Sequence, residues 1–155
     1  MPSKFITFRN CLMAALFAVA LGGTALRAYA ASEHGNAKEA KALLHKAVAA
    51  IKVDKSGALA KFNSGEDGFK DRDLYVFCVG PDWIATAGPT KGKNVKDLKD
   101  KKGKPMTKMM VEQAKEGKFK TISYLWPRPG VTEPSKKTSY FTKVDDQVCG
   151  VGYYK

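Results

Sequence analysis

The sequence predicts an α+β fold, in which a long N-terminal helix packs on a mostly antiparallel sheet of about five strands. Three observations support this prediction: an apolar stripe with helical spacing early in the chain, several strand-like runs after it, and one further helix among them. A long helix followed by a sheet with a single cross-over helix is an α+β layout.

The N-terminal segment has the features of a secretory signal peptide. Lys4 and Arg9 give it a positive start, Cys11 to Ala20 is apolar, and Ala28-Tyr29-Ala30 is a small-x-small cleavage site. The apolar run is shorter than the ~20 residues that a membrane anchor needs, although an uncleaved anchor is the alternative. We expect cleavage after Ala30 and a protein that is periplasmic or secreted.

The predicted signal peptide spans 1–30, and 31–155 has the length of a single domain. The whole chain has a net charge of +12, which falls to +9 without the three basic residues of the first segment. Such a balance favours anionic partners, for example organic acids, lipid head groups or polymers. Scattered lysines are also typical of a solvated surface, so charge alone does not define a binding site.

The first helix is predicted from an apolar stripe between Lys38 and Lys52. Its members recur every three or four residues: Ala40, Leu43, Leu44, Ala47, Val48 and Ile51. The same phase returns at Ala58, Leu59 and Phe62 after Gly57, so the helix continues, kinks or restarts there. Asn63-Ser64-Gly65 ends it.

The strands follow. The run from Leu74 to Val79 is apolar on both parities, as in a strand that is covered on both faces, and Trp83 to Ala87 forms a second short strand. After a lysine- and glycine-rich loop, Pro105 opens a helix that Gly117 is placed to end. Three more strands span 119–126, 137–144 and 147–154, and Asp145-Asp146 forms the turn between the last two.

The sequence shows no constellation that supports catalysis. The two histidines, His34 and His45, have no metal-ligand spacing to other ligating residues, and no nucleophile has a visible base partner. The glycine pair Gly150-x-Gly152 precedes no helix that would receive a phosphate. We therefore expect no enzyme activity, no metal and no cofactor.

Binding is better supported, by the aromatic strand 119–126. Alternation places Ile122, Tyr124 and Trp126 on one face. Tyrosine and tryptophan suit a largely apolar pocket with a few polar groups, but the same residues are also typical of a sheet core. The cysteines Cys78 and Cys149 form a disulfide, as expected for an even pair outside the cytoplasm, or remain two separate buried thiols.

Several ordered motifs between residues 38 and 154 give the chain a family resemblance. They are Ala58-Leu59-Ala60-Lys61-Phe62-Asn63, Asp73-Leu74-Tyr75-Val76-Phe77, Lys99-Asp100, Gly103-Lys104-Pro105, Tyr124-Leu125-Trp126-Pro127, Lys137-Thr138-Ser139-Tyr140 and Gly150-Val151-Gly152-Tyr153. In this order they resemble the single Cache domain, a PAS-like extracytoplasmic sensor module (Cache type 2), here in a stand-alone form. The resemblance implies a PAS-like fold and the binding of a small ligand.

The resemblance also implies a ligand class and a set of site residues. Short organic acids are the implied ligands, and the residues that line the site are Tyr124, Trp126, Lys137, Tyr140 and Tyr75. Lys137 precedes Tyr140 by three residues, so the two have opposite parity and share a pocket only if the strand bends or bulges between them. In PAS-like sheets the strands of Cys78 and Cys149 are neighbours, which favours the disulfide.

Two positions differ from the family pattern. Ala87-Gly88-Pro89 has glycine where many relatives have histidine, and Tyr124 stands where some acid-binding relatives have arginine. Both differences remove polar contacts to a ligand, so no single relative predicts the ligand of this chain.

The function predicted from the sequence is therefore a small-ligand sensor of the periplasm. It would act in signal transduction with a separate membrane receptor or histidine kinase, and we expect no nucleic-acid partner. The alternative is a basic surface-interaction protein that binds an anionic polymer or a membrane surface. Steep salt dependence would distinguish this alternative from binding in a single pocket.

Overall fold

A computed structural model describes residues 32–155, which form an α+β domain. The predicted signal peptide lies outside the described residues. Within 32–155 no helix has the length and apolar character to cross a membrane. The elements in chain order are α1 (Ala37–Val53), α2 (Lys55–Ser64), the 3-10 turn η1 (Glu66–Gly68), β1 (Lys70–Asp71), β2 (Leu74–Val79), β3 (Ala85–Ala87), α3 (Met106–Gln113), β4 (Lys120–Pro127), β5 (Pro134–Val144) and β6 (Gln147–Tyr154).

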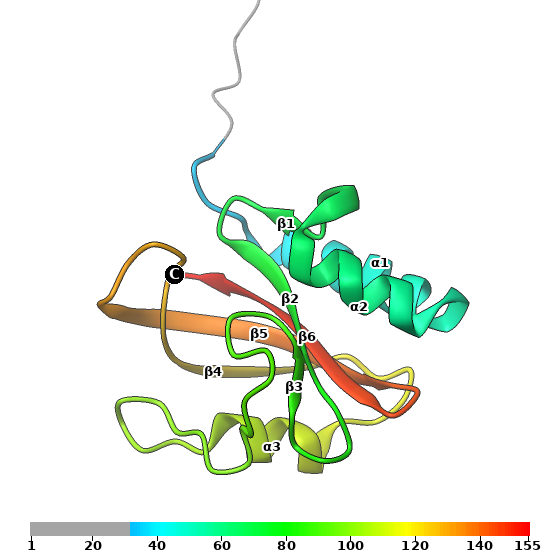
Figure 1. Cartoon of the computed structure of the whole chain (residues 1–155). Coiled ribbons are helices and arrows are strands. Elements are labelled where there is room, and N and C mark those ends of the chain that lie inside the picture. Colours follow the sequence, from blue (N-terminus) through cyan, green and yellow to red (C-terminus); the bar gives the residue numbers. More distant parts are fainter. Residues whose placement is uncertain (1–31) are drawn as a thin grey trace, which may run out of the picture. The chain divides into compact units, whose positions relative to one another are not determined.

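The strands form one antiparallel sheet with the order β1-β2-β6-β5-β4, and β3 pairs with β2. The helices α1 and α2 cover one face of this sheet, and α3 lies against the other face (Figure 1). The predicted α+β fold is confirmed. The sheet has one strand more than expected, because the two residues of β1 pair with the start of β2.

Local capping explains where the first two helices begin. Asn36 Oδ1 accepts hydrogen bonds from the amides of Lys38 and Glu39, and the carboxylate of Glu39 accepts one from the amide of Asn36. Asp54 ends α1 in an extended conformation and caps α2 by accepting from the amide of Gly57. The predicted helix therefore restarts, rather than continuing, before Gly57.

The helix α3 is shorter than the sequence indicates. It ends at Gln113, and Ala114 is already extended. Gly117, which was expected to end this helix, instead adopts a positive φ of 68° in the turn that leads to β4. Glu116 forms a parallel bridge with Lys143 of β5, so this segment joins the sheet instead of extending the helix.

Alternation along the strands gives the sheet two different faces. The residues of β2 that point to α1 and α2 are Leu74, Val76 and Cys78, and they join the larger apolar cluster. On the opposite face, Phe77 packs with the α3 methionines in a second, smaller cluster. The second cluster surrounds the candidate site.

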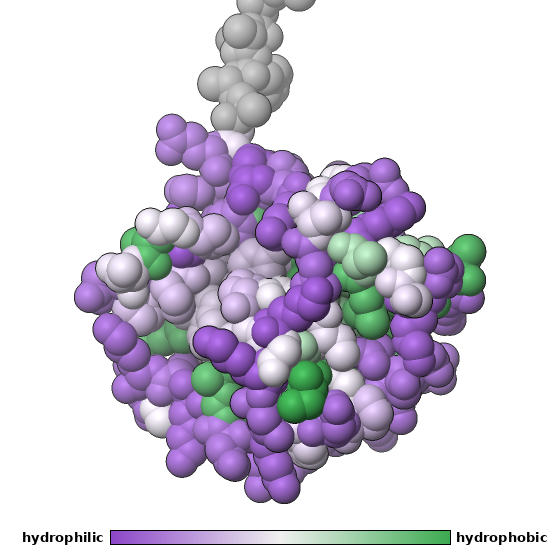
Figure 2. Space-filling model, viewed as in Figure 1, coloured by the Kyte–Doolittle hydropathy of each residue, from purple (hydrophilic) through white to green (hydrophobic). Residues whose placement is uncertain are grey.

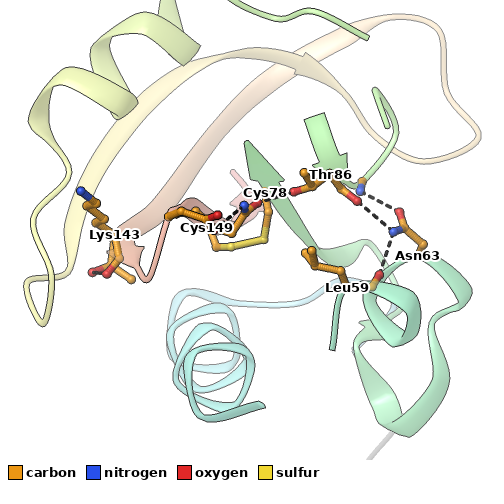
Figure 3. The surroundings of a disulfide bond; sticks show 10 residues. Leu59, Asn63, Cys78, Thr86, Lys143 and Cys149 are labelled. Carbon is orange, nitrogen blue, oxygen red and sulfur yellow. Dashed lines mark hydrogen bonds between the residues drawn. A yellow bond between two sulfur atoms is a disulfide. The ribbon is translucent and has the colours of Figure 1, made fainter. Parts of the chain in front are cut away.

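The disulfide is present between Cys78 of β2 and Cys149 of β6, which are direct partners across the strands. Both cysteines are fully buried on the α1 side. Figure 3 shows the disulfide and, beside it, Asn63 of α2, whose side-chain amide donates to the carbonyls of Leu59 and Thr86. These bonds attach α2 to β3, so the disulfide and the partly buried amide together hold β2, β3 and β6 in place.

Candidate functional site

The candidate site is a cavity of about 50 Å³ between α3 and the sheet, which we call the inner cavity. Strands β2 and β4 line it with aromatic side chains, and α3 adds two methionines: Tyr75, Phe77, Tyr124, Trp126, Met106 and Met110. A single water needs roughly 10–15 Å³ of such space, so the cavity has room for a few waters or a molecule of a few heavy atoms.

The strand register brings Lys137 to this region. Lys137 of β5 is the direct partner of Tyr124 in β4 and of Tyr154 in β6. In an antiparallel pair, directly opposite residues place their side chains on the same face. The lysine therefore points to the α3 side of the sheet between two tyrosines, and it is only 1% exposed.

The ammonium group of Lys137 is enclosed by aromatic rings. It donates a 2.7 Å hydrogen bond to the hydroxyl of Tyr75 and lies 3.9 Å from the centre of that ring. The rings of Tyr154 and Phe77 follow at 5.1 and 5.7 Å. Cation–π attraction compensates part of the cost of burying the charge. Lys137 does not line the inner cavity itself, whereas its hydrogen-bond partner Tyr75 does.

Burial lowers the pKa of Lys137 to about 7, and the carboxylate of Asp73 counteracts this shift. No ion pair between Lys137 and an acid occurs within residues 32–155. A buried ammonium without a carboxylate partner is costly, and an anion that reached it would lower that cost.

Two glycines of β6 make room for this arrangement. A Cβ atom at Gly152 would collide with the side chains of Lys137 and Ser139, and one at Gly150 would collide with the ring of Phe77. A larger residue at either position would displace the side chains around the ammonium. The sequence gives Gly150 and Gly152 no phosphate-binding role. The structure shows that the packing of the site requires glycine at both positions.

The remaining polar group of the site is the hydroxyl of Tyr124, which shares a 2.9 Å hydrogen bond with Ser139. Burial raises the pKa of Tyr124 and of Tyr75 far above the usual range, so both remain neutral hydroxyls. Trp126 packs edge-to-face on Tyr124, with ring centres 6.4 Å apart. The inner cavity thus offers neutral donors next to a single buried cation.

Four of the five predicted site residues meet on this face, namely Tyr75, Tyr124, Trp126 and Lys137. Tyr140 does not. It packs on the α1 side and stacks on Tyr153, with ring centres 6.2 Å apart. The pairing of β5 with both neighbours continues without a bulge, so strict alternation separates Tyr140 from Lys137. The expectation that both residues line one pocket is corrected.

Phe77 and Tyr154 surround the ammonium and Ser139 lies beside the Lys137 side chain, although none of the three is among the predicted site residues. Parity would have identified them, because Phe77 alternates in phase with Tyr75, and Ser139 with Lys137. Tyr154 is fixed by a hydrogen bond from its hydroxyl to the carbonyl of Pro127. Within the described part of the chain, no group of three or more histidine, cysteine, aspartate or glutamate residues is placed to hold a metal.

Comparison with known proteins gives a family and a set of similar folds. The model of the Cache domain family matches residues 34–154. A crystal structure of a methyl-accepting chemotaxis protein from Vibrio parahaemolyticus RIMD 2210633 is 26% identical with a TM-score of 0.61, and the match covers 76% of this chain and 86% of that one. No curated protein matches the chain.

Two further solved structures are similar in fold. One is a periplasmic sensor domain of a chemotaxis protein, 22% identical with a TM-score of 0.59, matched over 76% of this chain and 88% of its own. The other is described as showing carboxylic acid recognition by a Cache chemosensory domain. It is 20% identical with a TM-score of 0.54, matched over 76% of this chain and 86% of its own.

Proposed function

This chain belongs to the Cache domain family, and we propose that it is a periplasmic sensor domain that binds a short organic acid in the inner cavity. The observation that supports the proposal most is the buried ammonium of Lys137, which has a hydroxyl partner but no carboxylate at ion-pair distance among residues 32–155. A bound carboxylate would supply the missing negative charge. Charge-assisted hydrogen bonds of this kind are about twice as strong as neutral ones.

Tyr75 is the expected first contact of the ligand. Its hydroxyl accepts from Lys137 and its side chain lines the inner cavity. Because the oxygen accepts from an ammonium, its own hydrogen can be donated to a carboxylate in the cavity. In this arrangement Lys137 acts through Tyr75, or directly after a rotation of the tyrosine side chain.

The size and walls of the inner cavity favour a short acid. A space of about 50 Å³ excludes large molecules. The methionines Met106 and Met110 of α3 are buried at 2% and 5% exposure and form an adaptable apolar wall. A short acid would fit these walls with its carboxylate near the hydroxyl of Tyr75 and its alkyl chain against the methionines of α3.

We further propose that the domain acts with a separate membrane partner, a receptor or a histidine kinase. One similar solved structure is a methyl-accepting chemotaxis protein, and another is a periplasmic sensor domain of a chemotaxis protein. The disulfide agrees with an oxidising compartment. The role is ligand binding, not catalysis.

The proposal is tested by calorimetry with pairs of ligands that differ in charge. Formate, acetate, propionate and butyrate are titrated into the purified domain, and each corresponding amide serves as its neutral control. We expect at least one acid to bind and its amide to bind at least tenfold more weakly. Equal binding of acid and amide, or no binding of any acid, would contradict the proposal.

The alternative, binding of an anionic polymer or membrane surface, is favoured by one observation. The loop before α3 exposes six lysines: Lys91, Lys93, Lys96, Lys99, Lys101 and Lys102. Figure 2 shows that the visible side of the molecule is mostly hydrophilic, with apolar residues in small areas. Binding of heparin as a model polyanion that weakens steeply with salt, in the absence of any acid binding, would support this alternative instead.

A further inference from the structure

A second, larger depression lies next to the inner cavity, and we call it the outer groove. Its volume is about 390 Å³, and its lining includes Lys70, Tyr75, Pro89, Trp126, Arg128 and Pro129. Tyr75, Pro89 and Trp126 line both spaces. The outer groove has the volume of an ordinary small-molecule site, whereas the inner cavity is much smaller.

Arg128 is held in the outer groove with its guanidinium unpaired. The group stacks over the ring of Tyr154 at 5.0 Å, and Tyr154 is fixed by its hydrogen bond to Pro127. Its Nε atom is buried and has no hydrogen-bond partner. Arg128 takes part in none of the ion pairs among residues 32–155. An unsatisfied buried donor of this kind usually indicates a missing partner.

Lys70 adds a second positive charge to the outer groove. It is exposed, and its side chain runs over Gly65, where an added Cβ would lie 3.0 Å from the lysine Cδ. It too forms no ion pair within residues 32–155. The lining contains no aspartate or glutamate. Two cations that form no ion pair among residues 32–155, in a lining without an acid, make this surface attractive to anions.

The rest of the lining is mostly apolar. Pro89 and Pro129 are exposed, and Trp126 is half-buried. Asn63, the polar amide of the lining, already donates to two carbonyls and accepts from the amide of Gly88, so it is not free for a ligand. A suitable ligand therefore combines one negative group with a flat apolar body.

We propose that the outer groove is a second binding site, for a carboxylate carried on an aromatic ring. The carboxylate binds the fork of Arg128, Lys70 adds attraction, and the ring packs between Trp126 and the exposed prolines. Arginine is suited to this role because its planar group pairs with both oxygens of a carboxylate. The two charged residues of the outer groove do not line the inner cavity, and the proposal does not depend on the function proposed above.

The experiment uses benzoate as the probe and benzamide as its neutral analogue. Calorimetry on the parent domain should show benzoate binding and at least tenfold weaker benzamide binding. Arg128→Gln should weaken benzoate binding by about tenfold or more, and Lys70→Gln by less. Lys91→Gln, an exposed lysine outside the lining, is the matched control and should bind as the parent does. Arg128→Lys keeps the charge without the planar fork, so its affinity should be intermediate.

Separate variants distinguish the two sites. Lys137→Met should leave benzoate binding intact, and Arg128→Gln should leave the binding of short acids intact. If benzoate does not bind at millimolar concentration, or binds the parent and Arg128→Gln equally, the outer site is refuted. If benzoate binding is lost in Lys137→Met and kept in Arg128→Gln, benzoate occupies the inner cavity. That result would refute the outer site and leave the proposed function standing.

Discussion

The ammonium of Lys137 donates a hydrogen bond to the hydroxyl of Tyr75, 2.7 Å away and 62 residues earlier in the chain. This contact joins β5 to β2 across the intervening strand β6. It places the one fully buried cation of residues 32–155 directly behind a side chain that lines the inner cavity.

The stability of the domain should depend on pH through Lys137. Burial lowers the pKa of Lys137 from 10.5 to about 7, while the carboxylate of Asp73 opposes the shift. The tyrosines on this face, Tyr75, Tyr124 and Tyr154, have raised pKa values and stay neutral. Between about pH 7 and 10.5 the unfolded chain holds a proton that the folded domain has lost. Stability therefore rises with pH in this window, and the cost of the buried charge is largest below pH 7.

Urea unfolding of the parent and of Lys137→Met at pH 6 and pH 9 measures this effect. The parent should gain stability relative to the variant on going to pH 9, because the methionine has no charge to bury. Each unit of pKa shift corresponds to about 1.4 kcal/mol. The same pH dependence in both proteins would show that Lys137 does not titrate as described.

Gly152→Ala should destabilise the domain by about 1–3 kcal/mol, the usual cost of overpacking. The added methyl group collides with the side chains of Lys137 and Ser139. Chemical denaturation gives the value. A double-mutant cycle with Lys137→Ala supplies the control, because removing the lysine side chain should reduce the cost of the alanine. If Gly152→Ala destabilises the Lys137→Ala protein as much as the parent, the collision with Lys137 is not the cause of the lost stability.

The disulfide between Cys78 and Cys149 closes a long loop, since the two residues are 71 positions apart. Replacing both by alanine should lower the free energy of unfolding by about 4 kcal/mol on the chain-entropy estimate. Mass analysis after alkylation without reductant should find neither cysteine labelled in the exported protein. Alkylation of both would show that the bond does not form in the cell.

Processing after Ala30 remains a prediction, because that segment lies outside the described residues. N-terminal sequencing of the exported protein should begin at Ala31. A membrane-bound form that retains Met13 to Leu21 would identify the segment as an anchor.

Much of the fold was predictable because local signals agree with it. The bounds of β2 and β6 coincide with the predicted runs, and the two-residue turn at Asp145-Asp146 forms as expected, with Asp145 at a φ of 54°. The end of α3 was not predictable. The bridge from Glu116 to Lys143 joins residues far apart in the chain, and no local pattern indicates it.

The candidate site was predictable in part. Alternation places Tyr124 and Trp126 on one face, and the structure keeps them there. Tyr140 lies on the other face from Lys137, because three residues along an unbroken strand reverse the side to which the side chain points. The burial of Lys137 could not be predicted either, since it requires Tyr75, Phe77 and Tyr154 from two other strands.

The central claim, that Lys137 provides the charge for an acid in the inner cavity, is tested most directly by comparing two neighbouring lysines. Lys136 is exposed and Lys137 is buried, so Lys136→Met is the matched control for Lys137→Met. With the best short acid as ligand, calorimetry at pH 6 should show at least tenfold weaker binding in Lys137→Met, since a charge-assisted bond contributes about 1.5–3 kcal/mol. Lys136→Met should bind as the parent does. Equal affinity of both variants and the parent would contradict the account.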